Sequence, residues 1–146
     1  MSRIPKIVFT VAGTWGVLVV LPLYFLESSI NAQQPPPITH PEYYYGFVGV
    51  TLTWQVLFFV IAGNPRKYRL IMLVAIVEKL SYVLAASWLF VSGRAPNVVF
   101  LIALPDLALA VLFAVAYSKT PTAQSMEAMP DIRPISIDSA GGGTIQ

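Results

Sequence analysis

Four polar side chains that could do chemistry lie inside long apolar stretches of the sequence: Gln55, Glu78, Lys79 and Asp106. Two carboxyl groups in a buried layer can divide acid and base roles when their surroundings hold them in different protonation states. Alternatively, such groups within a membrane can bind a ligand or a proton, or form a structural polar clasp between helices. These four residues are therefore the candidates for a ligand or proton site. The sequence assigns no catalytic residue.

A second set of candidates lies just before an apolar block, in the tripeptide His40-Pro41-Glu42. A histidine beside a carboxylate can do acid–base chemistry or bind a metal weakly. One His with one Glu is less than a metal site needs, however, and the chain contains no Cys and no other His. We therefore expect a solvated turn at His40 and Glu42, no metal site and no cofactor. The sequence also lacks a P-loop, GxGxxG or HExxH motif.

The composition explains why polar side chains inside apolar stretches are informative here. Of the 146 residues, 56% are hydrophobic and only 11% are charged. A soluble domain averages about 45–50% apolar and about 25% charged residues. The composition therefore excludes a soluble domain, a disordered protein and a coiled coil. The net charge of only +2 excludes the usual nucleic-acid binder, so the expected partner is the lipid bilayer.

Four apolar blocks must position these side chains, at residues 7–26, 44–62, 69–92 and 98–117. Each is about 20 residues long, which lets a helix cross a hydrocarbon core of about 30 Å. Their continuous apolar character is unlike the alternation of barrel strands. Short turns at residues 63–65 and 93–97 make successive helices neighbours. We predict an all-α fold, with residues 1–117 as an up-down-up-down transmembrane four-helix bundle and 118–146 as a disordered cytoplasmic tail.

The basic residues predict the orientation of this bundle. They precede the first block, occupy the turn between the second and third blocks, and follow the fourth block. We expect the chain to lie in the inner (plasma) membrane of the cell. The positive-inside rule then places both termini in the cytoplasm. A cleaved signal peptide ending at Ala32 is the alternative for the first block. We expect no cleavage, because the apolar stretch is longer than that of a signal peptide.

The depths of the four polar side chains predict that they share one layer. Glu78 lies about 13 Å from the cytoplasmic side, Asp106 about 12 Å from the outer side, and Gln55 about 11 Å from the cytoplasmic side. Adjacent helical residues point about 100° apart, so we expect Lys79 to pair with Asp106 rather than with Glu78. Glu78 is then the better candidate for an acid that keeps its proton, with Gln55 as a candidate hydrogen-bond partner.

Proline and tyrosine residues give three further expectations. Pro22 and Pro105 are expected to kink the first and fourth blocks. The segment from Glu27 to Tyr43 is expected to be an outer loop, in which the prolines at 35–37 favour an extended polyproline conformation. The tyrosines at 43–45 are expected to form an aromatic belt at the outer interface.

Several of these features also occur together in one group of proteins. They are the pairs Gly46-Phe47, Trp54-Gln55, Glu78-Lys79 and Pro105-Asp106, and the turn from Asn64 to Arg69. With them, residues 40–80 and most of the chain up to Tyr117 resemble small uncharacterised bacterial four-helix membrane proteins, which are loosely similar to the DoxX-like group. The resemblance implies a four-helix membrane architecture and implies no activity.

Three functional hypotheses follow from the sequence. The first is a non-enzymatic bundle that binds a lipid-like or quinone-like molecule, or serves as an accessory subunit of a membrane complex. The second is a membrane enzyme acting on an isoprenoid or quinone, with Glu78 and Asp106 as its acid–base pair. The third is a proton-coupled exporter, which ranks last because the first block contains no acid or base. Candidate partners are another membrane protein or a second copy of the chain. We expect no nucleic-acid partner.

Overall fold

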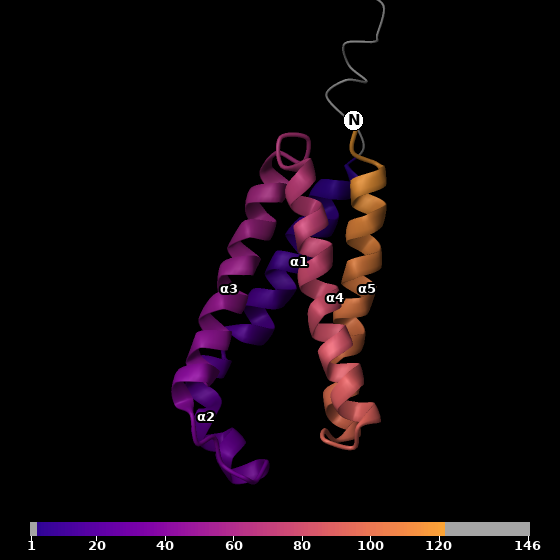
Figure 1. Cartoon of the computed structure of the whole chain (residues 1–146). Helices are drawn as coiled ribbons and strands as arrows, with labels where there is room; N and C mark the ends of the chain where they lie inside the picture. The colour runs from indigo at the N-terminus through magenta and orange to yellow at the C-terminus, as the bar shows by residue number, and fades with distance from the viewer. Residues whose placement is uncertain (1–2, 122–146) are drawn as a thin grey trace, which may run out of the picture.

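Five helices form the part of the chain that the structure, a computed structural model, describes: residues 3–121 (Figure 1). They are α1 (Ile4–Val20), α2 (Leu23–Gln33), α3 (Pro41–Gly63), α4 (Arg69–Val91) and α5 (Asn97–Ser118). These residues contain no strand, so the all-helical prediction is confirmed for them. The predicted disordered tail lies outside the described residues from position 122 onwards.

Three of the helices, α3, α4 and α5, are each long and apolar enough to cross a membrane. A fourth span results if α1 and α2, which meet at an angle of 52°, are counted as one bent span. These lengths and compositions indicate a multi-pass membrane protein. The ends of α3, α4 and α5 also lie close to those predicted from the apolar blocks.

The two prolines inside the predicted blocks have different effects. Pro22 lies at the break between α1 and α2, so the predicted kink of the first block is confirmed. Proline has no N–H to donate and its ring clashes with the preceding turn, which explains the break. In contrast, α5 continues through Pro105 without interruption. Proline is tolerated within transmembrane helices when the freed backbone groups are satisfied locally.

The predicted outer loop is wrong in its first half, because the helix α2 extends to Gln33. Residues 27–33 include Glu, Ala and Gln, which favour a helix, so the helix continues until the prolines at 35–37. The remaining connection is closed by a hydrogen bond in which the backbone N–H of Ile38 donates to Oδ1 of Asn31 (2.7 Å).

Two tyrosines at the start of α3 fasten α2 to it. The hydroxyl of Tyr44 donates to the carbonyl of Leu23 (2.6 Å), and that of Tyr45 donates to Oε2 of Glu27 (2.7 Å). The ring of Tyr45 also stacks on that of Tyr24, with centroids 5.9 Å apart. Besides being candidates for an aromatic belt, these tyrosines therefore hold the bent first span against the second.

The helices pack as two pairs rather than as a uniform bundle. α1 packs on α3, and α4 packs on α5. The pairs meet through α1 and α5, and through a short stretch of α3 and α4 near their connecting turn. Figure 1 shows the two pairs diverging away from that turn. The tight turn at Gly63-Asn64-Pro65 is as predicted, but it does not make α3 and α4 a closely packed hairpin.

Three phenylalanines form the centre of the core where the two pairs meet. Phe9 of α1 stacks on Phe113 of α5 with centroids 4.4 Å apart, and Phe58 of α3 meets Phe113 edge-on at 5.0 Å. All three side chains are completely buried. Buried alanines, among them Ala75 and Ala116, let the helices approach these rings. The aromatic core therefore joins α1, α3 and α5 where the two pairs meet.

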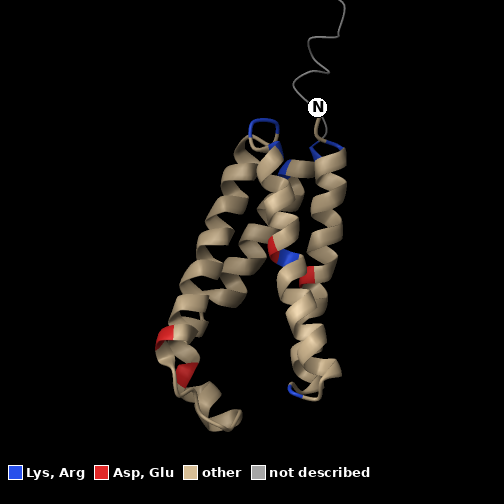
Figure 2. Ribbon diagram, in the orientation of Figure 1, with Lys and Arg blue, Asp and Glu red and all other residues tan. Residues whose placement is uncertain are grey.

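The charged residues are distributed unevenly along the molecule (Figure 2). One end carries six basic residues: Arg3, Lys6, Arg66, Lys67, Arg69 and Lys119. Glu27, Glu42 and Arg94 lie towards the other end, and a compact group of charges lies halfway along α4 and α5. The halfway group contains three of the residues that the sequence indicated as a candidate site.

Candidate functional site

Lys79 is the centre of this group. Its Nζ lies 3.1 Å from Oδ1 of Asp106 on α5 and 3.4 Å from Oε1 of Glu78, its neighbour on α4. The lysine side chain is only 6% exposed, which means that the ammonium lies between two carboxyl groups and largely out of contact with the surroundings. The predicted pairing of Lys79 with Asp106 is present in the structure.

The expectation that Glu78 and Lys79 do not meet is wrong. The Cβ atoms of adjacent helical residues do point about 100° apart. The lysine side chain has four methylene groups, however, and its flexible stem brings the ammonium back to the neighbouring carboxyl group. We refer to Glu78, Lys79 and Asp106 together as the charged cluster.

The protein covers the charged cluster incompletely. Oε2 of Glu78 is buried but has no hydrogen-bond partner among the described residues. The side chain of Asp106 is 25% exposed, and that of Glu78 is 18% exposed. A buried polar atom without a partner costs about 1–3 kcal/mol, and more when it is charged. The cluster therefore has an open hydrogen-bonding position and an accessible edge.

The aromatic core closes the cluster on one side. Nζ of Lys79 lies 5.5 Å from the ring centroid of Phe58, within the range of a cation–π contact. Since Phe58 belongs to the α1–α3 pair and Lys79 to the α4–α5 pair, this contact joins the two pairs. Phe58 was not singled out as a site residue, because a phenylalanine in an apolar block gives no signal of its own.

Gln55 lies in a different environment from the charged cluster. It is 2% exposed, and its Nε2 donates to the carbonyl of Thr51 on its own helix (2.9 Å). A Cβ at Gly16 of α1 would collide with the side-chain amide of Gln55, which shows how closely the two helices approach. Gln55 is therefore part of the α1–α3 contact, and the expected hydrogen bond to Glu78 is replaced by the bond to Thr51.

The outer candidates His40 and Glu42 contact each other but are well exposed. Nδ1 of His40 lies 3.0 Å from Oε1 of Glu42, and the two side chains are 65% and 62% exposed. They lie at the start of α3, where a carboxylate in the first turn interacts favourably with the helix dipole. Within residues 3–121, no group of three or more His, Cys, Asp or Glu side chains could hold a metal ion.

The charged cluster offers a position at which a ligand can bind. The Lys79 ammonium lies between the two carboxyl groups and contacts both. The partnerless oxygen of Glu78 can accept a hydrogen bond from an incoming hydroxyl group.

Comparison of the chain with family models, with curated proteins and with solved structures finds no match.

Proposed function

We propose that this protein is a non-enzymatic protein of the bacterial inner membrane that binds a lipid-like or quinone-like molecule at the charged cluster. The observation that carries the proposal is the partnerless Oε2 of Glu78 beside the ion pair of Lys79 and Asp106. An amphiphile with a hydroxyl or carbonyl head could complete the hydrogen bonding of this cluster. Its apolar part would remain among apolar side chains.

The cost of polar groups in lipid supports this proposal. A charged side chain at the bilayer centre costs at least about 2.5–3.5 kcal/mol, so such groups face a polar partner or a cavity. The protein itself leaves a quarter of the Asp106 side chain exposed. A ligand head that donates to Glu78 or accepts from Lys79 would lower this cost without the need for water in the hydrocarbon region.

The position of the cluster also suits an amphiphile. It lies where the α1–α3 and α4–α5 pairs begin to diverge, next to the aromatic core. Beyond it, α4 and α5 carry exposed apolar side chains, including Leu84, Trp88 and Leu101. If the head group of a ligand lies at the cluster, its apolar chain would therefore run along these helices. Small-molecule sites commonly occur between the helices of bundles.

The basic end supports an orientation for this site. With the six basic residues of that end in the cytoplasm, both termini lie on the cytoplasmic side and the diverging half of the molecule lies in the outer leaflet. An amphiphile from that leaflet could then reach the charged cluster by lateral entry between the helix pairs.

The test is to identify what the protein retains during gentle purification. The full chain would be purified in mild detergent, and its organic extract would be analysed by mass spectrometry beside two variants. Glu78→Leu removes the partnerless carboxyl group and leaves the Lys79–Asp106 ion pair intact. Thr53→Val removes a hydroxyl that bonds to the Gly49 carbonyl of its own helix (3.0 Å), and serves as the matched control.

We expect one class of amphiphile to be enriched with the wild-type protein and with Thr53→Val, and lost with Glu78→Leu. An equal content in all three proteins would contradict the proposal. A stoichiometric protein partner in place of an amphiphile would indicate the accessory-subunit role instead. Chemical conversion of the bound compound by the wild-type protein alone would indicate the enzyme.

A further inference from the structure

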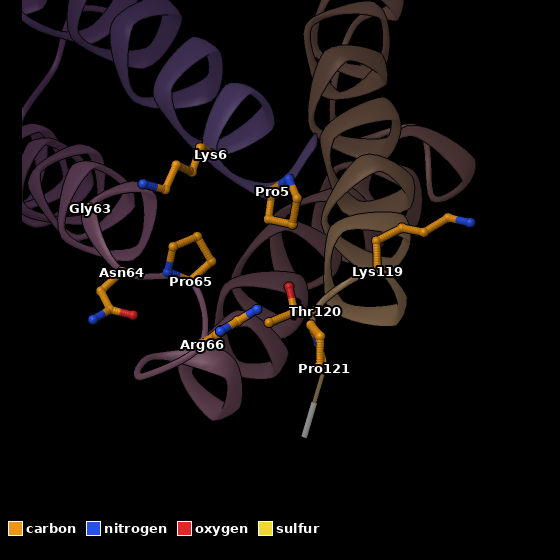
Figure 3. A pocket seen from close by; sticks show the side chains of 9 residues that line it. All are labelled: Pro5, Lys6, Gly63, Asn64, Pro65, Arg66, Lys119, Thr120 and Pro121. Atoms are coloured by element: carbon orange, nitrogen blue, oxygen red, sulfur yellow. The ribbon is translucent and has the colours of Figure 1, made fainter. Parts of the chain in front are cut away.

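A second site candidate lies at the basic end of the molecule, remote from the charged cluster. A hollow of roughly 200 Å³ opens there between the start of α1, the α3–α4 turn and the end of α5 (Figure 3). Each of these three segments contributes one basic residue to its lining: Lys6, Arg66 and Lys119 respectively. The three segments are far apart in the sequence, so folding places these residues around the same hollow.

The floor of the hollow is apolar or already satisfied. Pro5, Pro65 and Thr120 line it and are buried. The prolines have no backbone N–H to offer. The hydroxyl of Thr120 donates to the carbonyl of Ala116 (2.8 Å), and its own carbonyl accepts from Nε of Arg69 (2.9 Å). The basic side chains are therefore the main groups that a ligand in the hollow would meet.

Neither Lys6 nor Lys119 forms an ion pair with a carboxylate among residues 3–121. The four acidic residues of that part are Glu27, Glu42, Glu78 and Asp106, which lie at the opposite end or in the charged cluster. Basic side chains around one hollow give it a positive potential, which attracts an anion. The hollow is therefore electrostatically suited to an anion.

The side chains differ in how they are held. In Figure 3 the guanidinium of Arg66 lies towards Thr120, whereas the side chain of Lys6 extends along the other side of the hollow and the ammonium of Lys119 points away from it. Both lysines are exposed, so their flexible stems can turn towards a ligand. Arginine offers a planar set of donors that matches phosphate oxygens, and lysine adds a mobile point charge.

We propose that this hollow binds the phosphate group of an anionic membrane lipid. It lies at the end of the membrane-crossing helices, at the level expected for lipid head groups. Basic pockets between transmembrane helices on the cytoplasmic side are suited to such head groups. The lipid source is favoured over free phosphate because the acyl chains add apolar contact along the neighbouring helices. This site is independent of the function proposed for the charged cluster.

The test measures lipid retention by the full chain with native mass spectrometry in detergent. The probes are phosphatidylglycerol, which is anionic, phosphatidylcholine, which is zwitterionic, and inorganic phosphate, each added separately. We expect one phosphatidylglycerol to bind at least about tenfold more tightly than phosphatidylcholine. The double variant Lys6→Gln/Lys119→Gln should lose that preference, and Lys6→Arg/Lys119→Arg should retain it.

A charge-matched control separates a defined site from general attraction. Arg3→Gln/Lys67→Gln removes two positive charges from the same end but from outside the hollow lining. It should bind phosphatidylglycerol as the wild-type protein does. An equal loss in both Gln double variants would overturn the proposal, because attraction would then be diffuse. If the protein binds inorganic phosphate but not phosphatidylglycerol, the proposal that the phosphate belongs to a lipid is overturned.

Discussion

Nζ of Lys79 lies 3.1 Å from Oδ1 of Asp106, and this contact joins α4 to α5 at the level where the two helix pairs diverge. An ion pair in a low-dielectric layer gains little net stability over well-packed apolar side chains, but it penalises the loss of one partner strongly. Separating Lys79 from Asp106 would therefore be costly, and this cost keeps α4 and α5 in their relative position.

This contact predicts strong coupling between Lys79 and Asp106 in thermal unfolding. Asp106→Asn should lower the free energy of unfolding by about 1–3 kcal/mol, because it leaves the buried ammonium with only the more distant carboxyl group of Glu78 (3.4 Å) as its partner. Lys79→Met should also destabilise the protein. The double variant Lys79→Met/Asp106→Asn should recover part of the loss, since it leaves neither charge. Melting curves in detergent of the four proteins measure this coupling, and purely additive effects would contradict it.

The contact between Gly16 and Gln55 predicts a different effect. Gly16→Ala should destabilise the α1–α3 pair by about 1–3 kcal/mol, because the new Cβ would collide with the Gln55 amide. The matched control is Gly46→Ala, where a Cβ meets nothing within 4 Å. Alanine favours a helix over glycine, so the control should be neutral or slightly stabilising. Equal melting temperatures for the two variants would show that the approach of the helices is looser than described.

The basic end contains a third testable contact, between Arg69 and Tyr117. Nη1 of Arg69 donates to the tyrosine hydroxyl (2.9 Å), and the guanidinium carbon lies 3.8 Å from the ring centroid. Tyr117→Phe removes the hydrogen bond but keeps the ring, and should cost about 1–3 kcal/mol. Tyr43→Phe, at a tyrosine that is 74% exposed, is the control and should cost much less. Urea or thermal unfolding in detergent would compare them, and equal costs would contradict the role of this contact.

The absence of cysteine allows a direct test of the proposed orientation. Ser118→Cys places one thiol at the basic end, and Ser92→Cys places one in the α4–α5 turn at the other end. Both serines are exposed. In intact cells, a membrane-impermeant maleimide should label Ser92→Cys and not Ser118→Cys. The reverse pattern would place the basic end outside and contradict the proposed topology, and labelling after membrane disruption controls for thiol access.

Much of the fold and part of the site could be predicted from sequence, for identifiable reasons. Long apolar runs determine helix positions in a membrane, so the extents of α3, α4 and α5 were predicted closely. A buried lysine needs an anionic partner, which led correctly to Asp106. The chance that Lys79 also reaches Glu78 was missed, because helical spacing describes Cβ directions and not the ends of flexible side chains.

The features that sequence reasoning missed depend on tertiary packing. The C-terminal part of α2, residues 27–33, falls in the outer loop expected from the sequence, although Glu, Ala and Gln within it favour a helix. The packing of the helices as two pairs joined by the rings of Phe9, Phe58 and Phe113 is a tertiary feature that periodicity cannot give. The closeness of Gly16 to Gln55 had only a weak signal, the small residues at positions 12 and 16. The resemblance to DoxX-like proteins stays a prediction.

The most direct test of the proposed ligand site is the change in melting temperature when the extracted amphiphile is added back to delipidated protein. A ligand that binds only the folded state stabilises it by about 2.7 kcal/mol at a concentration of about 100 times its Kd. The account predicts that the wild-type protein and Thr53→Val gain stability, whereas Glu78→Leu melts at the same temperature with and without the amphiphile. An equal gain in Glu78→Leu would contradict the central claim, because the ligand would then bind without the open carboxyl oxygen of the charged cluster.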